Sequence, residues 1–390
     1  MGFTRRTFLG LATGAIATAA NLSLGRTALA AVAPDSLQDE IAAIADRAIG
    51  EVATPGVQIA LWRDGKPLSS FARGRANLET GTGTTIGSVF RIGSLTKQFT
   101  AALVALLAEQ GMLELDAPAS RYLPFLRKQP VFSVAELIHH TAGLHADEQA
   151  APLSGEVTQS RVAESIAAQN NLFDFPPGTA WQYSNANYHV LGAIIEQVTG
   201  QTLAEAADTR LFSRLALSHT AFDNAADIVP GRVAGYAFGD GDPPVLQNAP
   251  CIDIVQAGGA GAMRSTADDL CRWHAELFDG RVVNGSSLQA MLAPARLRDG
   301  RMASAQRARK EDAMMGQTEY GFGLLLDRAT RDGSLIVQHN GFIAGFSGYL
   351  ATHVPSRLTV ACLCNADPNP NLPFRALRRA VFAAVLAPPR

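Results

Sequence analysis

The sequence is short of lysine and cysteine, and these scarcities exclude several classes of protein. Four of its 33 basic residues are lysines, and beyond residue 30 the chain carries 30 basic residues against 35 acidic ones. A mildly acidic chain without clusters of basic residues lacks the basic patch that is typical of proteins that bind nucleic acid. Four cysteines in 390 residues do not make a disulfide scaffold, and a pairing of Cys251 with Cys271 stays open.

Long apolar runs are also lacking beyond the N-terminus. The two best candidates, 101–108 and 380–387, are eight residues each, whereas a membrane span needs about 20. Hydrophobic residues make up 47% of the chain and charged residues 17%, which is typical of a globular protein with a large core. The length indicates two domains or one large elaborated domain.

The first 30 residues resemble an export signal. Thr4-Arg5-Arg6-Thr7-Phe8-Leu9 opens a moderately apolar stretch, and Ala28-Leu29-Ala30 supplies the small side chains that precede a signal-peptidase cut. The pattern is similar to a twin-arginine signal, although Gly10 stands where the consensus has lysine. A transmembrane anchor is the alternative, but polar residues dilute the stretch. We therefore expect a mature protein that starts near Ala31, is exported by the twin-arginine (Tat) machinery into the periplasm or the medium, and has no stable membrane span.

The hydrophobic pattern predicts strands near both ends of the mature chain and helices between them. The first two strands should form a hairpin, because Asp64-Gly65 between apolar runs is a strong turn signal. Strands at both ends suggest one sheet that is interrupted by a helical region. The predicted strands are 57–62, 67–73, 320–326, 334–339, 345–353 and 358–364, and the clearest helices are 36–50, 96–110, 186–199, 266–279 and 373–386.

One Ser-x-x-Lys spacing occurs, at Ser94 and Lys97, where 21 serines and four lysines predict about 0.2 by chance. It lies at the start of a predicted helix, and residues three apart on a helix share a face. The free N–H groups at that helix end favour an anion, and a desolvated lysine amine can act as a base near neutral pH. The pair is a candidate nucleophile with its base. The alternative is a helix capped by Ser94, with Lys97 exposed.

Two further motifs follow along the chain. Tyr183-Ser184-Asn185 is the single Tyr-x-Asn in the sequence and lies in a loop before a predicted helix, which it could simply cap. His339-Asn340-Gly341 ends a predicted strand and is followed by the glycine-rich segment 345–348. Glycines at a strand edge permit close backbone approach by a ligand.

Ser-x-x-Lys, Tyr-x-Asn and a basic residue-x-Gly, in this order, resemble the serine β-lactamase and penicillin-binding-protein superfamily. The nearest branch holds the class C β-lactamases, the D-alanyl-D-alanine carboxypeptidases and related esterases. The resemblance covers roughly residues 36 to 385. It implies a β-lactamase/transpeptidase-like α+β fold, with an antiparallel sheet flanked by N- and C-terminal helices (31–92 plus about 315–390), an inserted mainly helical domain (about 93–314) and the active site between them. Supporting segments are Phe90–Gly93, Leu137–Leu144, Phe175–Gly178, Ala257–Gly259 and Ser265–Leu270.

The resemblance also implies a mechanism that requires no metal or organic cofactor. Ser94 attacks a carbonyl carbon and forms an acyl-enzyme, which water later releases. Lys97 and Tyr183 share the proton transfers, and Asn185 either bonds the substrate or orients Lys97. Ser94, Lys97, Tyr183 and Asn185 are therefore the expected catalytic residues.

On the late strand, the resemblance places His339 and Gly341 at the edge of the substrate, and the backbone N–H groups of Ser94 and Phe342 around the oxyanion. Penicillin-directed members usually have lysine in place of His339, and its charge meets the substrate carboxylate. An imidazole is largely neutral at pH 7 unless its surroundings raise its pKa. The variant is similar to esterases and D-amino-acid amidases or aminopeptidases. Any anion binding by protonated His339 should weaken as the pH rises through its titration.

We therefore expect an exported serine hydrolase that cleaves an ester, amide or peptide bond in a small substrate. The alternatives are a true β-lactamase or D-Ala-D-Ala carboxypeptidase, and a non-catalytic penicillin-binding or sensor protein on the same fold. The sensor is disfavoured, because a binding protein has no need of a lysine beside the serine. A zinc site at His139, His140 and His145 is disfavoured too, because no His-Glu-x-x-His spacing is present.

Overall fold

The structure is a computed structural model, and it describes residues 34–51, 53–145, 155–239, 245–309, 312 and 318–386. The predicted export signal therefore lies outside the described residues. The helices are α1 (Pro34–Gly50), α2 (Thr96–Glu109), α3 (Val134–Ile138), α4 (Gln159–Ala167), α5 (Asn185–Thr199), α6 (Leu203–Ala207), α7 (Gly258–Gly261), α8 (Ala267–Phe278), α9 (Gly285–Met291) and α10 (Phe374–Phe382). The strands are β1 (Gly56–Arg63), β2 (Lys66–Asn77), β3 (Thr82–Gly83), β4 (Phe90–Arg91), β5 (Ala221–Phe222), β6 (Tyr236–Phe238), β7 (Leu246–Asn248), β8 (Met263–Ser265), β9 (Glu319–Tyr320), β10 (Leu325–Asp327), β11 (Ile336–Ile343), β12 (Phe346–His353) and β13 (Leu358–Cys364).

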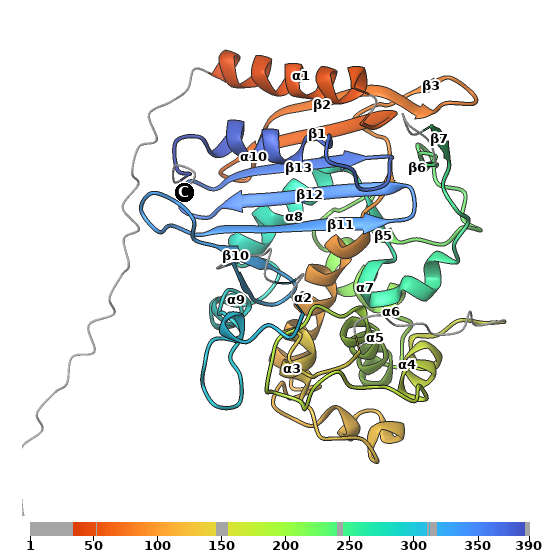
Figure 1. The fold of residues 1–390 in the computed structure, drawn as a ribbon, viewed down its shortest axis with the longest axis vertical. Coiled ribbons are helices and arrows are strands. Elements are labelled where there is room, and N and C mark those ends of the chain that lie inside the picture. The colour runs from red at the N-terminus through yellow and green to blue at the C-terminus, as the bar shows by residue number, and fades with distance from the viewer. Residues whose placement is uncertain are drawn as a thin grey trace, which may run out of the picture.

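Both ends of the chain build one antiparallel sheet, in the order β3-β2-β1-β13-β12-β11-β10-β9. Strand β1 pairs with β13 along its length, from Val57 opposite Cys364 to Arg63 opposite Leu358. Figure 1 shows α10 and α8 on opposite faces of this sheet, with α1 beside α10 and most other helices beyond the β11 edge. The predicted α+β arrangement, an antiparallel sheet flanked by N- and C-terminal helices, is confirmed.

Side-chain alternation gives this sheet a core on each face. On β1, Ile59 and Leu61 pack with α1 and α10, whereas Ala60 and Trp62 pack into the larger core that contains α2, α5 and α8. All four side chains are buried. A strand that is buried on both faces reads as a continuous apolar run, which is the pattern of 59–62 in the sequence, and the buried amide of Gln58 before it bonds backbone groups instead.

Turn chemistry explains where the strands end. Asp64 and Gly65 both have positive φ, of 50° and 74°, and they close the β1–β2 hairpin as predicted. The predicted single strand 320–326 is wrong, because it is split into β9 and β10. Gly323 has φ +67°, and a Cβ there would lie 2.6 Å from the Gln98 nitrogen, so the chain turns where it presses against α2.

Two other expectations from the sequence are settled by the described residues. All four cysteines lie within them and are free thiols, with Cys251 exposed and Cys271 buried, so these two do not pair. Within the same part of the chain, every helix is too short or too polar to cross a membrane.

Asn365 joins three separate segments just beyond the end of β13. Its Oδ1 accepts from the backbone N–H of Gly56 at 2.6 Å, and its Nδ2 donates to the carbonyls of Arg75 (3.1 Å) and Ala234 (3.0 Å). The side chain is fully buried. One amide side chain therefore satisfies backbone groups that water cannot reach.

We predict that Asn365→Ala lowers the free energy of unfolding by about 3 kcal/mol or more, because each buried polar group left unpaired costs about 1–3 kcal/mol. Chemical denaturation measures the loss. The control is Asn248→Ala, since Asn248 bonds Glu79 on the exposed surface and its loss should change stability by less than about 0.5 kcal/mol. Equal stability losses in the two variants would contradict this role of Asn365.

Candidate active site

Ser94 lies in a short 3-10 turn, Gly93–Leu95, that leads directly into α2. Gly93 has φ +50°, and a Cβ on it would lie 2.6–2.7 Å from backbone atoms of Phe342. Only glycine fits there, because any side chain would strain the backbone and collide with β11. The turn thus brings the Ser94 hydroxyl to the edge of the sheet, next to the strand that carries His339.

The amine of Lys97 is the centre of the site. Its Nζ donates to Ser94 Oγ at 3.0 Å, to Asn185 Oδ1 at 2.7 Å and to the Ala260 carbonyl at 2.8 Å. It also lies 4.9 Å from the centroid of the Tyr183 ring. The residue is fully buried in spite of its charge-bearing side chain. The alternative of an exposed Lys97 is therefore excluded, and the amine is within proton-transfer distance of the hydroxyl.

Glycines in α7 allow the Ala260 carbonyl to reach this amine. A Cβ on Gly259 would lie 2.6 Å from the Tyr188 carbonyl oxygen, and one on Gly258, which has φ +41°, would lie 1.8 Å from Gln159 Oε1. Helix α7 therefore packs directly against the backbone of α5. The Ala257–Gly259 segment, which belongs to the family resemblance, thus has a packing role beside Lys97.

The Tyr183-Ser184-Asn185 segment enters the site at the start of α5. Ser184 is the residue before the helix, and its Oγ donates to the His145 carbonyl at 2.8 Å rather than capping the helix. Its backbone N–H donates to His140 Nδ1 at 3.3 Å. With Ser184 fixed in this way, Tyr183 and Asn185 both lie beside the Lys97 amine.

His140, which lies in the Leu137–Leu144 segment of the family resemblance, supports the Tyr183–Asn185 segment from behind. It is fully buried, has φ +60°, and accepts at Nδ1 from Asn187 Nδ2 at 3.0 Å. Its ring packs against those of Tyr183, Tyr188 and Tyr320, with centroids 4.5, 5.2 and 4.8 Å away. Burial, helped by the charge of Lys97, holds its pKa well below 6.5. The described residues contain no group of three side chains able to hold a metal ion.

His339 lies on β11, across the site from Tyr183, with the two ring centroids 6.1 Å apart. Its Nδ1 is 2.5 Å from the Asn340 carbonyl, so Nδ1 carries the proton and Nε2 accepts from the Tyr320 hydroxyl at 3.4 Å. Burial, helped by the charge of Lys97, lowers the pKa of His339 to about 4, although the bond to Asn340 opposes the shift. The imidazole is therefore neutral at pH 7. The lowered pKa moves the expected titration of anion binding by His339 to about pH 4.

Sequence reasoning missed Tyr320, which links the two histidines of the site. It is buried on β9, and its ring contacts Trp181 as well as His140 and His339, at 5.8, 4.8 and 6.0 Å. The local signal was weak, because Tyr320-Gly321-Phe322-Gly323 resembled the start of an ordinary strand. Its partners lie far away in sequence, so the cluster becomes visible only once the chain is folded.

Gly341 and Phe342 bring the backbone of β11 against the nucleophile turn. A Cβ on Gly341 would lie 1.9 Å from the Ile92 carbonyl oxygen, so glycine is required for this approach. The Phe342 side chain is 43% exposed. The structure thus brings together all seven residues singled out in the sequence, around Ser94 and the adjoining strand.

Comparison with known proteins gives matches over nearly the whole described chain. The sequence matches the family model described as Beta-lactamase over residues 41–384. It is 26% identical to D-aminopeptidase of Gluconobacter oxydans (strain 621H) over 317 residues, which are 80% of this chain and 56% of that protein. It is 31% identical to esterase EstB of Burkholderia gladioli over 244 residues, which are 58% of this chain and 61% of that protein. The chain thus spans less than two thirds of the length of these curated relatives.

A solved structure extends the match to three dimensions. D-amino acid amidase from Ochrobactrum anthropi SV3, in complex with D-phenylalanine, is 25% identical and superposes with a TM-score of 0.73. The alignment covers 90% of this chain and 98% of that one. The sheet and the helices around Ser94 therefore have the same overall arrangement as in that amidase.

The lowered pKa of His339 predicts an acid-sensitive fold. Between about pH 6.5 and 4 the unfolded chain binds a proton at His339 and the folded protein does not, so stability rises with pH in this window and is lost as the pH falls through it. The shift corresponds to about 3 kcal/mol. We predict that His339→Asn reduces the slope of this dependence by the share of one histidine, measured by chemical denaturation at a series of pH values, while His139, His140 and His274, whose pKa values burial also lowers, keep the rest. His219→Asn, at an exposed site, is the control, and an unchanged slope in His339→Asn would contradict the prediction.

Proposed function

The chain belongs to the β-lactamase family, and from this premise we propose that it is an exported serine hydrolase which cleaves an ester or amide bond through a Ser94 acyl-enzyme. The observation that carries the proposal is the buried Lys97 amine, 3.0 Å from Ser94 Oγ and fixed by Asn185 and the Ala260 carbonyl. A protein that only bound a ligand would have no use for a buried amine directed at a hydroxyl. The sensor alternative is therefore the weaker one.

In the proposed acylation step, the Lys97 amine is neutral, keeps its two N–H donors on Asn185 and the Ala260 carbonyl, and takes the proton of Ser94 as Oγ attacks the carbonyl carbon of the substrate. The resulting tetrahedral oxyanion collapses and expels the alcohol or amine, which receives a proton from Tyr183 or Lys97. Water then attacks the acyl-enzyme with the same groups acting in reverse, and releases the acid. Asn185 keeps the Lys97 amine in position throughout. These steps require no metal or organic cofactor.

The backbone N–H groups of Ser94 and Phe342 are the proposed oxyanion donors. Ile343 pairs with Phe346 across a two-residue turn, and in such a hairpin the closing pair is hydrogen-bonded and its neighbours turn their N–H groups outward. Phe342 is the next residue, so this register directs its N–H to the outer edge of β11. Strand β10 pairs with β11 only as far as Gln338, which leaves that edge open within the described residues. Such preorganised donors typically contribute about 3–4 kcal/mol each.

The neutral His339 supports an ester or D-amino-acid amide substrate over a β-lactam. A buried imidazole with its pKa at about 4 offers a hydrogen bond but no charge to a substrate carboxylate. The names of an esterase, a D-aminopeptidase and a D-amino acid amidase among the similar proteins agree with this choice. A β-lactamase or D-Ala-D-Ala carboxypeptidase is the second candidate, because these substrates use the same acyl-enzyme chemistry.

We predict that the mature protein hydrolyses a short-chain nitrophenyl ester or a D-aminoacyl amide with a higher kcat/KM than a chromogenic cephalosporin. Ser94→Ala should abolish turnover while changing the free energy of unfolding by about 1 kcal/mol at most, because a half-buried serine at a helix start contributes little more than a cap. Ser286→Ala, at an exposed serine, is the matched control. Activity that survives in Ser94→Ala would place the nucleophile elsewhere, and a preference for the cephalosporin would favour the second candidate.

The export proposal rests on Arg5 and Arg6 in the sequence. Tat export depends on receptor recognition of the arginine pair rather than on charge alone. Replacement of both by lysine should therefore leave a precursor in the cytoplasm, detected by fractionation and immunoblotting. The double alanine variant of Thr13 and Thr18, farther along the same segment, is the control. Normal periplasmic accumulation of the lysine variant would contradict this route.

A further inference from the structure

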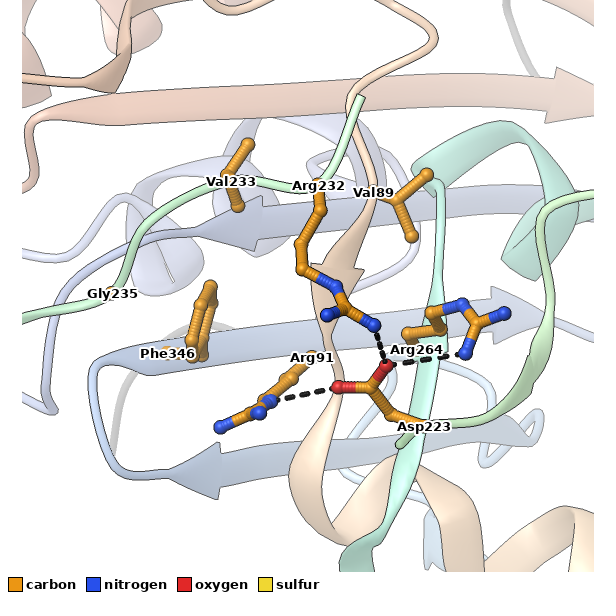
Figure 2. Close-up of a pocket in the computed structure, with 8 residues that line it drawn as sticks. All are labelled: Val89, Arg91, Asp223, Arg232, Val233, Gly235, Arg264 and Phe346. Atoms are coloured by element: carbon orange, nitrogen blue, oxygen red, sulfur yellow. Dashed lines mark hydrogen bonds and ion pairs between the residues drawn. The ribbon is translucent and has the colours of Figure 1, made fainter. Parts of the chain in front are cut away.

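A cavity of about 180 Å³ lies behind the Ser94 turn, separate from the amine of Lys97 and its partners. Figure 2 shows it between the three-stranded sheet β4-β8-β5 and the start of β12. The cavity is lined by both charged and apolar side chains. Its lining residues are Val89, Arg91, Asp223, Arg232, Val233, Gly235, Arg264 and Phe346.

Three guanidinium groups converge on one carboxylate in this cavity. Asp223 accepts from Arg91 Nε at 2.9 Å, from Arg232 Nη2 at 2.8 Å and from Arg264 Nη1 at 3.1 Å. The Asp223 side chain is 1% exposed, and Asp227 lies 3.6 Å from Arg264 at the rim. The three arginines therefore face two carboxylates, which leaves a surplus of one positive charge in this partly desolvated cavity.

The pairing also leaves donors unused. Arg91 bonds Asp223 through Nε alone, and its two terminal amino groups have no protein partner among the residues that the structure describes. Arg232 Nε is buried and, within the same residues, likewise has no acceptor. Figure 2 shows the Arg91 guanidinium extending away from Asp223 on the side of Phe346. A guanidinium with two free parallel N–H groups matches the two oxygens of a carboxylate.

The apolar residues that line the cavity determine which kind of group the rest of the ligand can carry. Val233 and the ring of Phe346 are buried apolar groups on one side of the Arg232 side chain, and Val89, also buried, lies on its other side. Gly235 completes this apolar wall, and a Cβ there would lie 2.6 Å from the Phe346 ring, so the chain cannot place a side chain in this space. A free inorganic oxyanion would gain nothing from such a wall, whereas a short hydrocarbon chain would bury apolar surface on it.

We propose that this cavity is a binding site for a small organic monocarboxylate, with its oxygens on Arg91 and its hydrocarbon part against Phe346. The surplus of one positive charge matches a monoanion, and the volume suits an acid of a few carbon atoms. The site differs from the Ser94 centre and goes beyond the proposed hydrolytic function. Arg91 lies three residues before the nucleophile in the chain, on the far side of the Gly93 turn.

Isothermal titration calorimetry of the full mature protein with butyrate tests the proposal, at constant chloride. We expect saturable binding of butyrate, and no detectable binding of butyramide, which has the same shape without the charge. Inorganic phosphate should bind more weakly than butyrate, because it cannot use the apolar wall. Equal responses to butyrate and phosphate would indicate a general anion site and overturn the carboxylate assignment.

Butyrate binding to three variants tests whether the ligand lies in this cavity. Arg91→Lys keeps the charge but loses the two-pronged donor, and should weaken butyrate binding about tenfold or more. Arg121→Lys, at an exposed arginine paired with Glu114, is the matched control and should bind as wild type does. Asn185→Ala, in the Ser94 site, should also bind butyrate normally. Loss of binding in Asn185→Ala, or full binding in Arg91→Lys, would place the ligand elsewhere.

A crystal soaked with butyrate provides a second test that does not depend on any variant folding. We expect the carboxylate within hydrogen-bond distance of the Arg91 terminal amino groups and the alkyl chain against Phe346. Butyrate density only beside Ser94, or no density in the cavity at a saturating concentration, would overturn the proposal. Loss of hydrolytic activity in Ser94→Ala bears on the proposed function alone and leaves this result unaffected.

Discussion

The buried amine of Lys97 is the constraint on which the site depends. A lysine this far from water needs a full set of hydrogen-bond acceptors, and it takes them from the α2 turn, from the start of α5 and from α7. Each of these segments must approach closely, which explains the glycines at 93, 258 and 259, where a side chain would collide with backbone or with a buried amide. The residues near Ser94 are therefore determined as much by the packing around one amine as by chemistry.

A second constraint is electrostatic. His140 and His339 share the site with Lys97, and burial together with its charge keeps both imidazoles neutral. The Tyr320 hydroxyl and the Asn340 carbonyl fix His339 in one tautomer. The site therefore has one amine and two neutral histidines around the hydroxyl, which suits a substrate without a carboxylate at this position.

Much of this arrangement could be predicted from the sequence, because its signals are local. The Ser94–Lys97 spacing needs only one helical turn, and the Asp64-Gly65 hairpin needs only its own residues. Tyr320 and the role of His140 could not be predicted, since their partners come mostly from segments far away in the chain. The division between β9 and β10 was missed for the same reason, because Gly323 turns where it meets the backbone of α2. The Arg91–Asp223 cluster likewise joins residues 132 apart.

The rate of acylation at Ser94 when the Lys97 amine is removed tests the role of this amine most directly. Rapid-quench mass spectrometry of the Ser94 peptide would follow the acyl adduct from a nitrophenyl ester, in wild type and in Lys97→Met, whose side chain has a similar length and no amine. We predict an early adduct on Ser94 in wild type and a rate at least about a hundredfold lower in Lys97→Met, since general base catalysis contributes about 10²–10⁴-fold. Acylation of Ser94 at the wild-type rate in Lys97→Met would contradict this role of the amine.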